Sequence, residues 1–227
     1  MLNTTRHAQR GETLVGLMVG MTVGLIVTAA SLAMLISTLS LNAQAINNSY
    51  LNQELKTIMD LMVRDVRRAQ YSGTAMGCIG GASCTNAFSG GTEDWTVAAN
   101  QVDYTYDENS NGTQDSGECS GFRRAVVSGV GRVEKKNSCT PTWQPLSDEK
   151  STSIDDLRFS VSTTCIAAVS PGTGFLAVRV VKIYLQGSQA GATRRMCQKV
   201  KIKNDLATAA CTATTLSTAA PFDICPP

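Results

Sequence analysis

The stretch that decides the fold is residues 10–40, RGETLVGLMVGMTVGLIVTAASLAMLISTLS. Its apolar part, Leu14 to about Leu39, contains no charged residue, and after Glu12 the next charge is Glu54. A run of about 20 apolar residues is long enough to cross a bilayer as a helix. The residues before it are polar and basic, which predicts a cytoplasmic N-terminus and places the chain beyond the helix in the periplasm.

Two simpler interpretations of this segment stay open. A secretory signal peptide could be cleaved after the small-x-small motif Ala43-Gln44-Ala45, but its apolar region is typically about 7–15 residues and this one is roughly twice as long. A plain single-span anchor explains the hydrophobicity, but it does not explain the residues around Gly11.

The segment Arg10-Gly11-Glu12-Thr13-Leu14-Val15-Gly16-Leu17-Met18-Val19 resembles the cleavage and methylation site of type IV prepilins. The resemblance implies that a prepilin peptidase cuts between Gly11 and Glu12 on the cytoplasmic face. The apolar helix is then retained, and the new amino group is methylated. Thr13, Leu14 and Leu17 stand where the family has them, as does Met18.

Two residues depart from the family pattern. Glu12 stands where the first mature residue is usually Phe, and Gly16 stands at the fifth position, where the family usually has Glu. In the family this glutamate neutralises the terminal amine of a neighbouring subunit in the apolar filament core, where an unpaired charge is costly. A subunit with Gly16 cannot supply that carboxylate. This predicts a place at or near the filament tip, or local neutralisation by Glu12 instead.

Gly16, Gly20 and Gly24 recur at every fourth residue and therefore lie on one helix face. Small residues at this spacing let helices approach closely in lipid or in a filament core. Glycine is also common in membrane helices in general. The strict register favours a packing face.

Residues 41–72 continue as an amphipathic helix. An apolar stripe recurs at helical spacing and predicts a face that packs on a domain. The stripe consists of Leu51, Leu55, Ile58, Met62, Val66 and Ala69.

Residues 73–204 shift to Gly, Ser, Thr and Asn and contain several segments typical of strands. The sequence predicts an α+β, pilin-like fold, in which the long helix covers one face of an antiparallel sheet. The expected strands are Trp95–Ala98, Gln101–Tyr106, Phe122–Ser128, Arg132–Lys136, Ile154–Ser162, Phe175–Gln186 and Met196–Lys203. In the last of these, lysines alternate with apolar residues, which is typical of the wet face of a strand and could mark an edge strand.

Scattered elements in this order resemble the PilW type of minor pilin and the J-type pseudopilin of secretion systems. They are Met62–Tyr71, the Tyr104-Thr105-Tyr106 strand leading to Phe122-Arg123-Arg124, Ile154–Phe159 and Ala177–Ile183. The resemblance extends loosely to about residue 204. Residues 205–227 form a tail, rich in Ala and Thr, that remains unassigned.

Eight cysteines lie beyond residue 77 without paired zinc-type spacing, which predicts disulfides and an oxidising compartment. Eight cysteines allow about 105 pairings, so sequence does not fix the connectivity. Local pairing is the simplest hypothesis. It joins Cys78 to Cys84, Cys119 to Cys139, Cys165 to Cys197, and Cys211 to Cys225.

Residues 107–118, DENSNGTQDSGE, fit the calcium-loop pattern D-x-[DN]-x-[DN]-G-x5-E. Calcium ligands would come from Asp107, Asn109, Asn111, Thr113, Asp115 and Glu118, and Gly112 permits the sharp turn. Gln114 stands where the pattern usually has an apolar residue, and a strand precedes the loop, so no EF-hand domain is expected. A solvated polar turn uses the same residue types. The hypothesis is a structural Ca²⁺ site that orders the loop.

The composition argues against most enzymes and nucleic-acid binders. His7 is the only histidine and lies in the leader, which excludes the common His-dependent nucleophilic systems in the mature chain. Lys and Arg total 20 and Asp and Glu total 18, and removing Arg6 and Arg10 with the leader leaves these totals equal. A neutral chain lacks the basic footprint of a nucleic-acid binder.

The resemblance therefore predicts a non-enzymatic minor pilin that helps initiate type IV pilus assembly. It would reside in the inner membrane with a periplasmic domain and then in the pilus. Its partners would be other minor and major pilins, prepilin peptidase and the inner-membrane assembly machinery. The alternatives are a minor pseudopilin of a type II secretion system and a tip-displayed adhesin or binding module.

Overall fold

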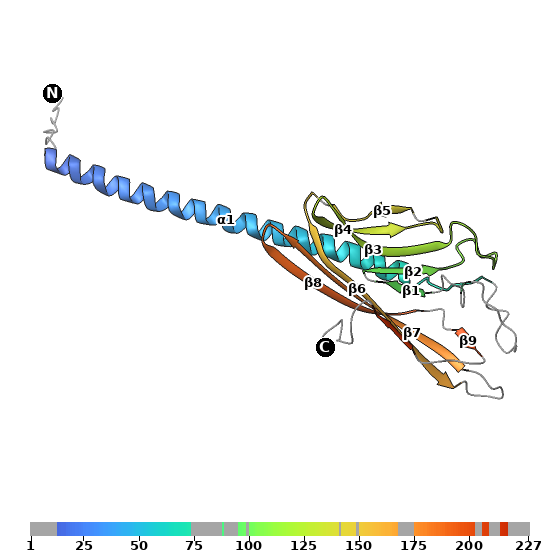
Figure 1. The fold of residues 1–227 in the computed structure, drawn as a ribbon. Helices are drawn as coiled ribbons and strands as arrows, with labels where there is room; N and C mark the ends of the chain where they lie inside the picture. Colours follow the sequence, from blue (N-terminus) through green and yellow to red (C-terminus); the bar gives the residue numbers. More distant parts are fainter. Residues whose placement is uncertain are drawn as a thin grey trace, which may run out of the picture. The chain divides into compact units, whose positions relative to one another are not determined.

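The computed structural model describes residues 13–73, 88, 95–98, 100–140, 142–148, 150–167, 175–202, 206–208 and 214–217. The chain divides into two compact units, Met1–Ile46 and Asn47–Pro227. We describe each unit by itself. Figure 1 shows the long helix α1 and the strands that come after it in the chain.

Helix α1 extends over Leu14–Val66. It contains no proline, and its first part is a nearly continuous apolar sequence that favours helix. All side chains of α1 up to Ile46, in the first unit, are exposed. Apolar side chains are normally buried away from water. Their exposure here fits a segment whose natural surroundings are lipid or other helices.

In the second unit, the last part of α1 is amphipathic. The six stripe residues, from Leu51 to Ala69, are all buried, as the helical spacing predicts. The helix itself ends at Val66, earlier than the expected 72. Gln70 has a positive φ of 60° and donates its N–H to the Thr105 carbonyl at 2.7 Å. This left-handed residue closes the turn that follows the helix and sends the chain toward the sheet.

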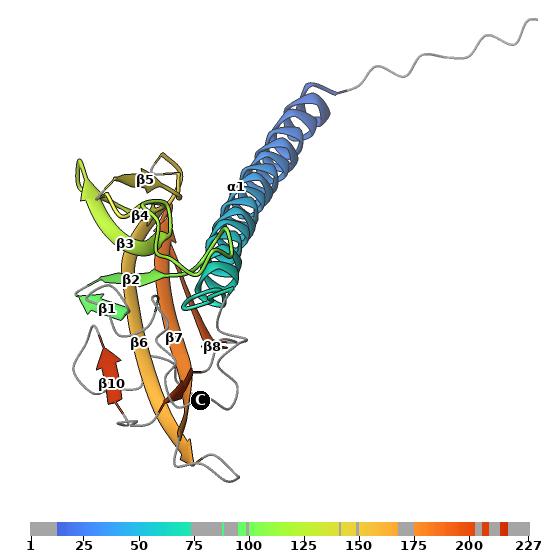
Figure 2. The ribbon, with the colours of Figure 1, turned by 90° about the vertical axis from the view of Figure 1, so that its right-hand side faces the viewer.

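Five strands form the first antiparallel sheet in the order β1-β2-β3-β4-β5 (Figure 2). Their bounds are β1 Trp95–Ala98, β2 Gln101–Thr105, β3 Cys119–Val127, β4 Val130–Lys136 and β5 Trp143–Pro145. The β3–β4 hairpin closes through Ser128 and Gly129, both at positive φ. Two consecutive residues with positive φ give the turn that matches the twist of antiparallel strands.

The second antiparallel sheet has the order β10-β6-β7-β8, with β9 also paired to β7. Its bounds are β6 Ser153–Ala167, β7 Phe175–Gln189, β8 Ala192–Lys201, β9 Leu206–Thr208 and β10 Thr214–Ser217. Strands β6 and β7 are long and pair along their whole length, with one irregularity between Ile154 and Asp156. Figures 1 and 2 show these two strands lying side by side.

A single apolar core joins the end of α1 to both sheets. At the helix, a Cβ on Gly187 of β7 would lie 2.9 Å from Leu55 Cδ2. Between the sheets, a Cβ on Gly131 of β4 would lie 1.9 Å from the Ile154 carbonyl oxygen, and Arg124 Nε donates to that oxygen at 2.6 Å. Because no side chain fits at Gly131, glycine there is what lets β4 cross β6 closely.

The expected fold class is confirmed, with two corrections. The seven expected strands all exist, but they divide between two sheets instead of forming one. The short strands β5, β9 and β10 were not expected. Strand pairing between distant segments decides the number of sheets, and local alternation does not report it.

Candidate functional site

The first candidate region is the exposed part of α1. The helix is long and apolar enough to cross a membrane, and none of the residues in its most apolar stretch is buried. A Cβ added at Gly20 or Gly24 meets no atom within 4 Å, and one at Gly16 meets only Thr13 of its own helix. The three glycines therefore lie open along the helix. Packing of this face against another subunit stays a prediction.

The expected processing residues, Gly11 and Glu12, lie outside the described residues. The described chain begins at Thr13, whose hydroxyl oxygen accepts the Gly16 amide at 3.4 Å. Threonine is an accepted N-cap residue because its side chain satisfies one of the free amides of the first turn. Helix α1 thus begins next to the expected cleavage point.

The second region is a buried ionic cluster centred on Asp65, near the end of α1. One carboxylate oxygen of Asp65 lies 3.0 Å from Lys135 Nζ of β4 and accepts the Ser120 hydroxyl of β3 at 3.0 Å. The other oxygen accepts the Arg68 guanidinium, which also lies 4.5 Å over the Tyr106 ring. Asp65 is 4% exposed, so one carboxylate joins the helix to two strands of the first sheet.

Burial and ion pairing compete at Asp65. Burial alone would raise the pKa of its carboxyl group. The hydrogen bonds and charges of Arg68 and Lys135 outweigh burial and hold that pKa below its ordinary value. Asp65 is therefore ionised at neutral pH.

Sequence reasoning missed this cluster, although a signal existed. Asp65 comes three residues after Met62 and therefore lies on the buried face of the predicted helix. A carboxylate on such a face needs a cationic partner. Nothing local indicates that Lys135, far along the chain, supplies it.

The third region is the loop 107–118, where all six expected calcium ligands occur. Asp107 and Glu118 are buried, with 1% and 2% exposure. Asp107 accepts the amides of Gly73 at 2.8 Å, Asn111 at 3.1 Å and Gly112 at 2.9 Å. The two buried carboxylates thus draw the loop backbone inward.

Backbone and side-chain amides surround three of the four carboxylates of this loop, those of Asp107, Asp115 and Glu118. Glu118 accepts the amides of Glu108 at 2.9 Å and Asp115 at 2.8 Å. The side-chain amides of Asn109 and Asn111 both donate to Asp115, at 2.7 and 2.9 Å. Within the described chain, no group of three or more His, Cys, Asp or Glu side chains could hold a metal ion. The Thr113 backbone amide donates to the Asn111 side-chain oxygen at 2.8 Å. Calcium binding stays a prediction.

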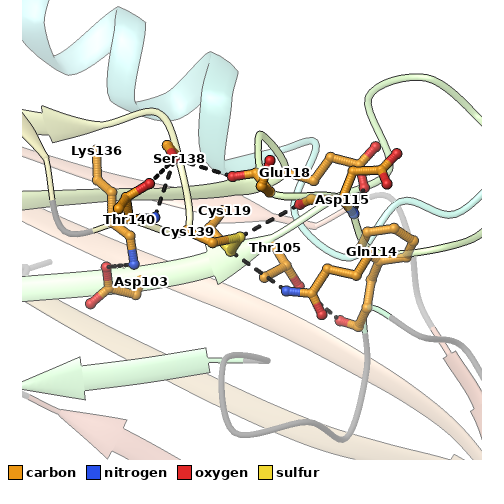
Figure 3. Close-up of a disulfide and its surroundings, with 12 residues drawn as sticks. Asp103, Thr105, Gln114, Asp115, Glu118, Cys119, Lys136, Ser138, Cys139 and Thr140 are labelled. Atoms are coloured by element: carbon orange, nitrogen blue, oxygen red, sulfur yellow. Dashed lines mark hydrogen bonds and ion pairs between the residues drawn. A yellow bond between two sulfur atoms is a disulfide. The ribbon is translucent and has the colours of Figure 1, made fainter.

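A disulfide joins Cys119, at the start of β3, to Cys139. Figure 3 shows it beside Gln114 and Asp115 of the loop 107–118: the Gln114 side-chain amide lies 3.5 Å from Cys119 Sγ, and Cys139 Sγ lies 3.6 Å from the Asp115 carbonyl oxygen. The Cys139 amide also donates to the Ser116 carbonyl at 2.8 Å. This bond is one of the local pairs expected, and it fixes the end of the loop 107–118.

The expected Cys165–Cys197 pair is wrong. Both residues are disulfide-bonded, but Cys165 lies in β6 opposite Ala177 and Cys197 lies in β8 opposite Tyr184. Strand β7 separates them, and two strand spacings of about 4.8 Å already exceed the roughly 7 Å that a disulfide spans between Cα atoms. Each therefore bonds a different cysteine. Cys78, Cys84, Cys211 and Cys225 lie outside the described residues.

Comparison with known protein families identifies one that matches this chain. The family model described as "Prepilin peptidase-dependent protein B" (PpdB) matches residues 44–203. The match covers well over half of the chain. The chain belongs to the PpdB family. The searches of curated proteins and of solved structures returned no match.

The PpdB match extends from the end of the exposed helical segment through β8. It therefore comes from the domain, whereas the prepilin resemblance in residues 10–19 comes from the other end of the chain. A prepilin-like subunit that depends on prepilin peptidase and carries an N-terminal apolar helix accounts for both. The match does not include Gly11 or Glu12.

The ionic cluster makes a testable contribution to stability. Asp65→Asn leaves Lys135 and Arg68 without their counter-charge, so we expect the unfolding free energy to fall by about 2 kcal/mol or more at pH 7. Because the pKa of Asp65 is lowered by folding, this contribution is complete above about pH 4 and is lost as pH falls through the folded-state pKa. Denaturant unfolding of the detergent-solubilised full chain across this pH range measures both effects.

The matched control is Asp60→Asn, an exposed aspartate on the same helix. It should leave stability unchanged within about 0.5 kcal/mol. Glu134, whose pKa is lowered by Arg123 and Arg132 against the effect of burial, leaves part of the acid sensitivity in the Asp65→Asn variant. Equal stability of Asp65→Asn and wild type at pH 7 would contradict the role given to Asp65.

Proposed function

We propose that this chain is a minor pilin of a type IV pilus. The observation that carries the proposal is the exposed apolar first part of α1, which continues into a domain of the PpdB family. Such a helix is stable in only two settings, a bilayer before assembly and a bundle of like helices after it. A filament subunit held in the inner membrane and then extracted into a pilus uses both.

The described features favour a structural role over an enzymatic one. Among the described residues, the pKa departs from its ordinary value at Asp65, Arg68, Tyr104, Tyr106 and Glu134. Asp65, Arg68 and Tyr106 belong to the cluster that attaches α1 to the first sheet, and Tyr104 accepts the Ser120 hydroxyl of that cluster at 3.4 Å. Glu134 is bound by two arginines of the same sheet. Their perturbed pKa values thus accompany packing contacts of the fold.

The proposal includes processing by prepilin peptidase and assembly with other pilins through the inner-membrane machinery. The runner-up is a minor pseudopilin of a secretion system, which shares the processing and the helix. The domain elements resemble both the PilW type of minor pilin and the J-type pseudopilin, so the filament fraction in which the processed chain is found decides between the two. An adhesin or binding-module role at the tip is compatible with the same placement.

Processing is tested by N-terminal analysis and intact mass of the protein made with and without its host's prepilin peptidase. We expect the mature chain to begin at Glu12 only when the peptidase is present. Gly11→Leu should block cleavage because the family requires glycine there, whereas the matched variant Gly24→Ala should be cleaved normally. A mature chain that begins at Ile46 would mean an ordinary signal peptide. Retention of residues 1–11 beside an active peptidase would mean a plain anchor.

A location at or near the filament tip is inferred from Gly16. Without a carboxylate at this position the subunit cannot neutralise the amine of a neighbour, so it fits where no such neutralisation is needed. We expect Gly16→Glu to change the number of pili per cell or the composition of their tips, and Gly16→Gln, which adds no charge, to behave as wild type. Immunogold labelling and pilus counts measure this. Unchanged pili in Gly16→Glu would remove the tip argument.

The loop 107–118 is proposed to bind Ca²⁺ as a structural ion. Support comes from the complete ligand pattern in the sequence and from the Cys119–Cys139 bond, which fixes the end of the loop. Binding requires the Asn109 and Asn111 amides to present oxygen to the ion. Calorimetry on the full chain should show millimolar or tighter binding that Asp107→Asn with Glu118→Gln abolishes. No heat in the wild type would reject the site, and Glu108→Gln serves as control.

A further inference from the structure

The second sheet has one apolar face and one polar face. Phe159 on β6 and Ile183 on β7 belong to the apolar core, which α1 and the first sheet share. Successive side chains of a strand point to opposite faces, so the residues next to these point the other way. The register places five side chains near one another on this polar face, which we call the outer face: Ser160, Lys182, Tyr184, Cys197 and Lys199.

The outer face is partly covered. Ser160 is only 8% exposed, although its side chain points away from the apolar core. Lys182, which lies opposite Ser160, is half-buried. Lys182 and Cys197 also each have an interaction partner. Because α1 and the first sheet pack on the apolar face, another segment is needed to account for this cover.

Cys197 limits which segment this is. Its thiol is disulfide-bonded. Cys119 bonds Cys139, and strand β7 separates Cys197 from Cys165. The partner of Cys197 is therefore one of the four cysteines outside the described residues. These are Cys78, Cys84, Cys211 and Cys225.

Cys211 is too far from Cys197 to be its partner. It comes three residues after Thr208, which lies opposite Phe175 of β7. Cys197 lies opposite Tyr184 of the same strand. From Phe175 to Tyr184 the strand rises about 30 Å. Three extended residues and the span of a disulfide together cover only about 18 Å.

Cys225 can reach Cys197 across the outer face. Ser217 of β10 pairs with Ser160, which pairs with Lys182, which pairs with Lys199, so these residues form one row across the sheet. Three strand spacings and two residues along β8 place Cys197 about 16 Å from Ser217. The chain from Ser217 to Cys225 spans up to about 28 Å. The opposite face is filled by the core, so the outer face is the direct route.

Cys78 and Cys84 fit less well. Both follow α1 in the chain, and α1 packs on the apolar face, where a Cβ on Gly187 would lie 2.9 Å from Leu55 Cδ2. A segment that starts from that face would have to pass around the edge of β8 to reach Cys197.

The charge of residues 218–227 also matches the outer face. These residues include Asp223 and no Lys or Arg, whereas the face carries Lys182 and Lys199. In an extended segment Asp223 and Cys225 point to the same side, about 7 Å apart. When Cys225 meets Cys197, the carboxylate of Asp223 therefore comes over β7 near Lys182.

We propose that the outer face of the second sheet is the docking site of residues 218–227 of the same chain, which a disulfide between Cys197 and Cys225 holds in place. This pairing replaces the Cys211–Cys225 bond expected from the sequence. It closes the basic outer face to other partners while the disulfide is intact. The inference concerns the domain alone and does not depend on processing at Gly11 or on assembly into a filament.

The experiment is peptide mapping of the non-reduced full chain from host cells, with free thiols blocked by N-ethylmaleimide. Trypsin releases Cys197 in Met196–Lys199, and cleavage before aspartate separates Cys225, in a peptide that starts at Asp223, from Cys211. We expect mass spectrometry to find the first peptide linked to the second. No variant is needed, so this test does not depend on the folding of a mutant.

Docking on the face is tested by the reactivity of Lys182 toward an acetylating ester in the full chain. Cys197→Ser with Cys225→Ser removes both thiols of the bond. We expect the acetylation rate of Lys182 to rise roughly tenfold, which corresponds to about 1.4 kcal/mol of lost protection. Lys56, exposed on α1, should react at an unchanged rate.

The matched control is Cys78→Ser with Cys84→Ser, which should keep both the Cys197–Cys225 link and the slow reaction of Lys182. Formation of the Cys119–Cys139 bond and resistance to protease report that each variant folds. A link from Cys197 to Cys78, Cys84 or Cys211 overturns the inference, as does a free Cys197 thiol or a disulfide between two chains. An unchanged Lys182 rate in the folded variant without Cys197 and Cys225 overturns the docking.

Discussion

The domain is organised around one buried carboxylate. Asp65 is the point at which the end of α1, the third strand and the fourth strand meet, since it binds Arg68, Ser120 and Lys135 together. An unpaired carboxylate at that depth would be costly, so the helix has only one low-energy position against the first sheet. The apolar stripe supplies attraction, but attraction alone tolerates sliding along a smooth surface. The ionic cluster fixes the register of the helix.

The second sheet is held to the same helix by close approach instead of charge. Gly187 lies against Leu55, and Gly131 lets the first sheet cross the second at Ile154. The two contacts require backbone, not side chain, at the point of crossing. The domain thus combines a specific polar attachment on one sheet with a tight steric fit on the other, and the helix is fixed by both.

The sequence predicted the helix and the strands, because each of these depends on the spacing of neighbouring residues. The stripe from Leu51 to Ala69 is predicted by helical spacing, and the strands are predicted by alternation and β-branched residues. The features that could not be predicted depend on distant partners. The path of the chain after the helix depends on Gln70 meeting Thr105, and the close crossing of the two sheets depends on Gly131. Strand β5 has only three residues, too few for a pattern. The Cys165–Cys197 hypothesis failed because nearness in sequence says nothing about an intervening strand. At the loop 107–118 the pattern predicted Ca²⁺ ligands, and the amides that donate to Asp107, Asp115 and Glu118 could not be read from that pattern.

The Cys119–Cys139 bond has a mechanical consequence. The bond closes a sequence separation of 20 residues that contains the whole β3–β4 hairpin. When the two ends of the chain are pulled apart, tension passes through the two sulfur atoms and bypasses that hairpin. About 70 Å of chain contour is thereby withheld from extension, given about 3.5 Å for each residue. A subunit that has to bear traction would keep two strands of its first sheet, and the Lys135 that binds Asp65, outside the line of force.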